Sequence, residues 1–121
     1  GFSMPLPIRD RNSGNIEAAR AEIRAAEAER ASARVGASTR ISNATANLSA
    51  ANARVEALER GAIPEGREAL RLAQLSYEAG KIELIELLDA QAALTSAETQ
   101  LIEARLAQAE ATAELARATA Q

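Results

Sequence analysis

The chain has 121 residues and a formal charge of −3, and it contains neither Cys nor His. Without those side chains it can form no disulfide, no Ser-His or Cys-His catalytic set, and few of the usual zinc and copper sites. Acidic and basic residues are interspersed without a basic run, so we expect no nucleic-acid partner. No apolar run approaches the roughly 20 residues that a membrane-spanning helix requires.

Alanine makes up about a quarter of the chain, in long stretches with Glu, Arg and Leu, a composition typical of coiled coils and long helices. The only aromatic residues are Phe2 and Tyr77. Aromatic side chains usually supply much of the buried area of a compact core. The composition therefore favours thin, closely packed helix pairs over a thick globular core.

Residues 1–12 predict a short extended lead-in. Apolar residues alternate with polar or proline residues from Phe2 to Ile8, and a period of two indicates a strand with one apolar face. Pro5 and Pro7 would restrict such a strand to the edge of a sheet. A single strand is not stable alone, so we expect its partners to lie outside this chain.

A long outgoing helix is predicted over residues 13–78. Ile41, Leu48 and Val55 stand seven residues apart, with alanines filling the positions between them, which is typical of an alanine-rich coiled-coil seam. Pro64 lacks the N–H that a helix interior needs. We therefore expect the helix to be kinked or broken near residues 61–66.

A tight reversal is predicted over residues 79–83, because Gly80 is suited to the position that follows the last residue of a helix. The return helix is predicted over residues 84–120. One of its apolar stripes repeats every seven residues, at Leu87, Leu94, Leu101 and Leu115. A second stripe, containing Ile85, Leu88, Ile102 and Leu106, lies beside it. Such a broad apolar surface predicts contacts with more than one neighbouring helix.

The expected helix lengths indicate that the hairpin is incomplete by itself. Residues 15–78 would span roughly 95 Å and residues 83–120 roughly 57 Å, so the return helix would cover the outgoing one only to about residue 40. The apolar stripe of residues 16–40 would then need a helix from elsewhere. We expect the chain to be a fragment or processed segment that self-associates or belongs to a larger subunit.

The candidate functional residues gather at the reversal: Tyr77, Gly80, Lys81, Glu86 and Asp89. Glu86 and Asp89 are three residues apart and share one helix face. They are interpreted either as solvated helix surface or as a charged lining that faces an aqueous passage. Tyr77 could pack against the bend or hydrogen-bond to a neighbouring hairpin, and Lys81 could complement a helix C-terminus or form an ion pair between hairpins.

Two segments carry a family resemblance. Tyr77, Gly80 and the segment Leu84-Ile-Glu-Leu-Leu-Asp89-Ala-Gln91 resemble the signature of the TolC-type outer membrane efflux proteins. The opening segment, from Pro5 to Ile16, resembles the strand-to-helix junction of the same family, particularly its heavy-metal (Czc-type) cation-efflux branch. The two segments occur in the family's order, and the resemblance covers the second helical-hairpin repeat of a family subunit.

The resemblance implies a trimer in which each subunit contributes strands to an outer-membrane barrel and two helical hairpins to a periplasmic tunnel. The barrel strands are absent from this chain. By resemblance, Tyr77 belongs to the tip network that closes the tunnel entrance, and Glu86 and Asp89 match acidic positions near the constriction. The chain has Ile82 where some family members carry a tip arginine, with Lys81 adjacent to it.

The predicted fold is all-α: a long antiparallel helical hairpin of coiled-coil type with an extended N-terminal lead-in. The resemblance implies part of the periplasmic tunnel of an outer membrane efflux channel, with a periplasmic adaptor and an inner-membrane pump as partners. Two alternatives are the coiled-coil hairpin of a periplasmic adaptor, and a purely structural coiled coil. We expect no enzymatic activity, no cofactor and no metal site.

Overall fold

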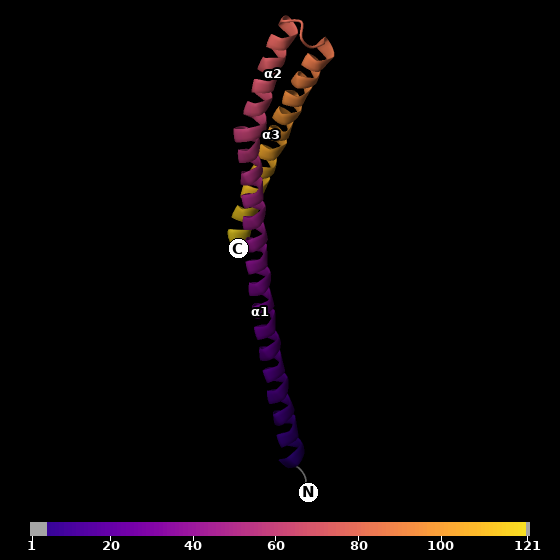
Figure 1. Cartoon of the computed structure of the whole chain (residues 1–121). Helices are drawn as coiled ribbons and strands as arrows, with labels where there is room; N and C mark the ends of the chain where they lie inside the picture. The colour runs from indigo at the N-terminus through magenta and orange to yellow at the C-terminus, as the bar shows by residue number, and fades with distance from the viewer. Residues whose placement is uncertain (1–4, 121) are drawn as a thin grey trace. The chain divides into compact units, whose positions relative to one another are not determined.

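The computed structural model describes residues 5–120, and that range contains helices and no strand. In chain order the helices are α1 (Pro5–Ala57), the π-helix η1 (Leu58–Ala62), α2 (Ile63–Glu78) and α3 (Leu84–Thr119) (Figure 1). The predicted all-α helical hairpin is therefore confirmed. The chain divides into two units, between Thr39 and Arg40, and each is described by itself.

The N-terminal unit contains the first part of α1, which begins at Pro5. The structure therefore shows helix where the sequence predicts an extended lead-in, while residues 1–4 lie outside the described range. Proline is tolerated in the first turn of a helix because the N–H groups there have no partner within the helix. The assignment of residues 1–12 as a lead-in from a barrel stays a prediction. Further along this unit the side chains of Ile16, Ile23 and Val35 are exposed.

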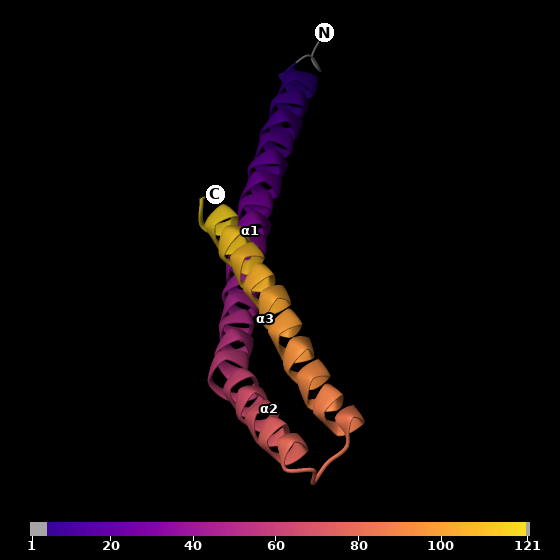
Figure 2. The ribbon, with the colours of Figure 1, turned by 90° about the horizontal axis from the view of Figure 1, so that it is seen from above.

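The second unit is the hairpin itself. Helix α3 folds back along α2, η1 and the last part of α1, as two perpendicular views show (Figures 1 and 2). A buried cluster of Val55, Leu58 and Ala104 lies where η1 meets α3, with Ala62 and Leu101 packed against it. The hairpin is thus held by a narrow seam between helices, as its alanine-rich composition predicts.

The seam on α3 has a regular pattern. Its least exposed residues follow one another at alternating steps of three and four, which is the spacing of a coiled coil. In order they are Leu87, Ala90, Leu94, Ala97, Leu101, Ala104, Gln108, Ala111, Leu115 and Ala118. Large and small side chains alternate, and the alanines allow the facing helix to come close: Ala104 is 1% exposed, and Ala44 on α1 is 2% exposed.

The facing seam on the outgoing chain changes phase at η1. From Ala44 to Ala62 the seam residues are alternately four and three apart. The next seam residues, Gly66, Leu70 and Ala73, each lie one residue later than a strict heptad would place them. A π-helical turn takes up such an extra residue. It keeps the seam of α2 directed at α3. The π-turn interrupts the α-helix at the start of the stretch, residues 61–66, where the sequence predicts a kink or break, and α1 and α2 run in different directions on its two sides (Figure 2).

Proline chemistry accounts for the position of η1. The N–H of Ile63 donates to the carbonyl of Leu58, five residues earlier. Pro64 follows as the second residue of α2. In a continuous α-helix its ring would clash with the carbonyl of Arg60, and that carbonyl would lose its donor. The wider π-turn reduces this clash, so the helical path continues.

Helices α2 and α3 come close together at Gly66. A Cβ atom at this position would lie 3.2 Å from Cδ1 of Leu94 and 3.6 Å from its Cα. The missing side chain of Gly66 thus provides the space that Leu94 occupies in the seam.

Candidate functional site at the hairpin tip

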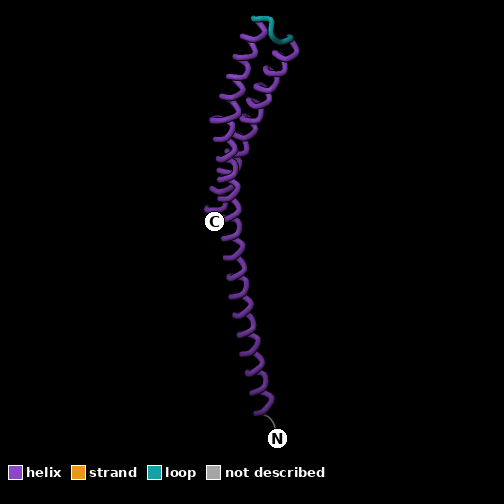
Figure 3. The backbone as a smooth tube through the Cα atoms, viewed as in Figure 1, coloured by secondary structure: helices purple, strands orange, loops and turns teal. Residues whose placement is uncertain are grey.

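The reversal begins with a Schellman motif that ends α2. The N–H of Lys81 donates to the carbonyl of Ser76 at 2.8 Å, and the N–H of Gly80 donates to the carbonyl of Tyr77 at 3.0 Å. Gly80 has φ of +72°, a left-handed conformation that residues with a Cβ adopt at a steric cost. The glycine that predicts the turn therefore occupies the position that requires it. The loop that this turn opens joins α2 to α3 at the end of the hairpin (Figure 3).

Helix α3 starts directly after the turn. Glu83 has an extended backbone, and its carbonyl accepts hydrogen bonds from the N–H groups of Glu86 and Leu87 at 3.1 and 3.4 Å. Its side chain makes no capping hydrogen bond. Glu86 lies in the first turn of α3, where a carboxylate is favoured by the positive end of the helix dipole.

Tyr77 lies in the last turn of α2 and is 41% exposed. At this exposure the bend does not enclose it, and Leu72 and Leu75 of the same helix are exposed as well. The structure thus places the Tyr77 ring on the surface, where it is accessible to a neighbouring chain.

Lys81, Glu86 and Asp89 are all exposed. Glu86 and Asp89 lie on consecutive turns of α3, with Asp89 outside the seam that faces α2. Within residues 5–120 no group of three or more acidic side chains could hold a metal ion. What the structure brings together at the tip is therefore a solvated pair of carboxylates, a lysine and an exposed tyrosine, with no enclosed pocket around them.

Apolar side chains surround these polar ones. Leu84, Ile85 and Leu88 at the start of α3 are each more than half exposed. Further along the same helix, Ile102 and Leu106 are exposed too. The second apolar stripe predicted for the return helix is thus on the surface, while the stripe of Leu87, Leu94, Leu101 and Leu115 faces the hairpin's own seam. The tip combines charge with an apolar face that the hairpin itself leaves open.

Two polar contacts cross the hairpin away from the tip. Nη2 of Arg105 on α3 donates to Oε1 of Glu59 in η1 at 2.6 Å, and Nε2 of Gln108 donates to Oδ1 of Asn52 on α1 at 2.7 Å. Neither contact was predicted from the sequence. The signal for the second was present, because Gln108 stands seven residues after Leu101 and interrupts the leucine series.

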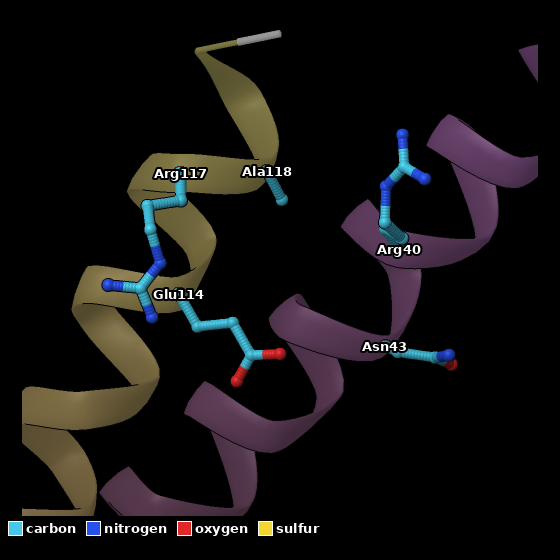
Figure 4. Close-up of a pocket in the computed structure, with 5 residues that line it drawn as sticks. All are labelled: Arg40, Asn43, Glu114, Arg117 and Ala118. Atoms are coloured by element: carbon cyan, nitrogen blue, oxygen red, sulfur yellow. The ribbon is translucent and has the colours of Figure 1, made fainter.

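A hollow lies near the end of α3, lined by Arg40 and Asn43 of α1 and by Glu114, Arg117 and Ala118 of α3 (Figure 4). Its position agrees with the expectation that the return helix reaches about residue 40. The hollow is open, and its charged side chains are exposed. No buried polar or charged residue occurs among the described side chains, so this hollow offers no built ligand site.

None of the helices in the described range is both long enough and apolar enough to cross a membrane.

Comparison with known proteins links the hairpin to a family. The family profile described as "Outer membrane efflux protein" matches residues 1–121. The cobalt-zinc-cadmium resistance protein CzcC of Cupriavidus metallidurans is 33% identical over 97 residues, covering 80% of this chain and 23% of that protein. The chain thus spans about a quarter of the length of this relative. No solved structure matches the chain significantly.

Proposed function

Because this chain belongs to the outer membrane efflux protein family, we propose that it forms one helical hairpin of a periplasmic export tunnel and part of the entrance to that tunnel. The observation that carries the proposal is the family match over the whole chain, on a sequence that folds as a long antiparallel hairpin. The same match disfavours both the hairpin of a periplasmic adaptor and a purely structural coiled coil.

The open apolar face supports an assembled tunnel. An exposed apolar stripe of this size on one helix needs a partner surface. Ile102 and Leu106 belong to this stripe on α3, and in the proposed trimer they would pack against a neighbouring hairpin. The assembly would be anchored in the outer membrane by parts of the protein outside these residues, and it would dock a periplasmic adaptor and an inner-membrane pump.

The tip is the proposed entrance. Tyr77 and Lys81 are exposed beside the Gly80 turn and would form hydrogen bonds and ion pairs with the tips of neighbouring hairpins. Loosening these contacts would let the tips separate and the tunnel open. The role is passive, because no residue described here is arranged to bind a nucleotide or to transfer protons, and the transport energy would come from the pump.

The proposed cargo is a divalent heavy-metal cation. The support is the similarity to a protein named for cobalt, zinc and cadmium resistance, together with the exposed carboxylates of Glu86 and Asp89. Carboxylates at a narrow mouth raise the local concentration of cations. They would act on passing cations by charge alone, without a resident metal site.

Single-channel conductance of the complete protein tests this proposal. The double variant Glu86→Gln/Asp89→Asn should lower the preference for cations over anions roughly two- to tenfold at low salt, and the effect should fade at high salt as screening increases. Glu103→Gln/Glu110→Gln, which removes two exposed carboxylates of α3 far from the tip, is the matched control. Unchanged selectivity in the double variant would contradict the entrance assignment.

A further inference from the structure

We propose that the π-helical turn η1 is a hinge about which α2 and the tip bend further, and that the Glu59–Arg105 ion pair is the latch that holds this hinge at the angle seen in the structure. The proposal goes beyond the tunnel assignment, because it concerns bending within one hairpin. It holds or fails independently of the cargo.

The backbone at η1 is the first argument. The hydrogen bond from Ile63 to Leu58 spans five residues instead of four, and the next residue, Pro64, has no N–H to donate. The regular i→i−4 ladder is therefore interrupted at two successive positions. Helices bend sharply at π-bulges and prolines, and here both occur within seven residues.

The seam is packed more tightly on the α1 side of η1 than on the tip side, as a hinge that moves the tip requires. On the side of α1, Val55 and Leu58 are buried against Ala104. On the side of the tip, the seam residues Leu70 and Ala73 of α2 and Leu87 and Ala90 of α3 are only partly buried. Both ribbon views show α2 and α3 separating toward the tip (Figures 1 and 2). Contacts between the helices that would resist bending thus decrease beyond the seam contact of Gly66 with Leu94.

The latch follows from the position of Glu59. This residue belongs to η1 itself, and both Nε and Nη2 of Arg105 donate to its Oε1, at 3.3 and 2.6 Å. The ion pair therefore ties the irregular turn to α3. The Glu59 side chain is 43% exposed and that of Arg105 is 59% exposed. Exposed ion pairs are weak and sensitive to salt, so this contact can hold the hinge and can also release it.

The chain provides a matched control one residue away. Arg60 pairs with Glu56 at 3.0 Å within the same helical stretch. That pair has the same chemistry and is more exposed, and it does not reach α3. Removing it should change the local charge in the same way without releasing the hinge.

The test measures distance distributions by pulsed electron spin resonance in the complete protein. Spin labels are placed at Ala53, on the α1 side of η1, and at Glu78, at the end of α2; both residues are exposed. Labelled subunits are diluted with unlabelled ones. The 121 residues contain no Cys, so labels attached at introduced cysteines are unambiguous in this region.

Glu59→Gln should increase the population of more strongly bent conformations, seen as shorter distances between the labels at Ala53 and Glu78, about two- to fivefold. This is the change expected when a weak exposed pair is lost. High salt should have the same effect in the unsubstituted protein. The exchange Glu59→Arg/Arg105→Glu should restore the original distribution, and Glu56→Gln should leave it unchanged. Pro64→Ala, which returns an N–H to the ladder, should narrow the distribution.

Two results would overturn the proposal. If Glu59→Gln and Glu56→Gln shift the distances equally, the pair across the hairpin is no latch. If Pro64→Ala leaves the distribution as broad as before, η1 is no hinge. Circular dichroism of each variant separates bending from loss of helix. Because no transport is measured, failure here would leave the tunnel assignment intact, and failure of the conductance test would leave the hinge intact.

Discussion

The two halves of the hairpin, divided at η1, differ in how closely the seam between their helices is packed. Toward the chain ends, seam residues such as Ala44, Ala104 and Ala111 are buried. Toward the tip, the seam residues Leu70 and Ala73 of α2 are only partly buried. Large apolar residues outside the seam, such as Leu88 and Ile102, are exposed in both halves. The hairpin therefore closes its seam most tightly away from the tip, and it leaves a second apolar stripe open along its length.

The closed half should be the more sensitive to added volume. Ala104→Leu would force three extra carbon atoms into the contact with Val55 and Leu58, where Ala104 is 1% exposed. We expect this overpacking to lower the free energy of unfolding by about 2 kcal/mol, measured by urea denaturation of the complete protein. Ala107→Leu makes the same change at an exposed position of α3 and should have a clearly smaller effect. Equal losses in the two variants would mean that the alanine seam is not closely packed.

Replacing the polar contact between Gln108 of α3 and Asn52 of α1 should raise the stability of the hairpin instead of lowering it. Gln108→Leu would complete the leucine series and remove the hydrogen bond to Asn52. A polar residue at a coiled-coil core position fixes the register at some loss of stability. We therefore expect the variant to be more stable by roughly 1 kcal/mol but less uniform in register.

Cysteine cross-linking measures the register directly. A disulfide between cysteines introduced at Val55 and Ala104 reports the native pairing. A disulfide between cysteines at Val55 and Ala111 reports a pairing shifted by one heptad. The shifted product should increase in the Gln108→Leu background. If the native product alone forms, the register is set by the tip turn and not by this hydrogen bond.

The sequence predicted the parts of the hairpin that depend on local chemistry. Gly80 has the left-handed conformation that the reversal requires, and the heptad of leucines faces the seam. The π-turn was missed because its sign is a shift of one residue in the seam after Ala62, which is easily hidden beside the stronger signal of Pro64. The alternation near Pro5 indicated an extended segment, whereas the structure has helix from Pro5 onward, where the first turn of a helix tolerates proline.

The site was predictable only in its position. Tyr77, Lys81, Glu86 and Asp89 gather at the tip because the turn is local. All four are exposed within this chain, and one sequence does not specify what another chain would contact. The contact of Arg105 with Glu59 joins residues 46 positions apart, and it depends on a helical phase that changes at η1. Interactions between exposed side chains of that kind leave little pattern in a sequence.

The smallest expected effect concerns the ion pair between Glu68 and Arg71, which lies within α2 in the tip half and does not cross the hairpin as the Glu59–Arg105 pair does. In α2, Nε of Arg71 donates to Oε2 of Glu68 at 2.9 Å, and this hydrogen bond, more than the charge of Arg71, lowers the pKa of Glu68 below its usual 4.5. A carboxyl whose pKa is lowered on folding stabilises the folded state above its unfolded pKa, and this contribution is lost as the pH falls through the folded pKa. Both groups are exposed and belong to one helix, so the contribution is small.

A ¹³C NMR titration should find a pKa below 4.5 for Glu68, which rises toward that value in Arg71→Gln. Since this pair does not reach α3, Arg71→Gln should leave the spin-label distances across η1 unchanged, and a shift in those distances would mean that the exposed pairs of the tip half also hold its two helices together.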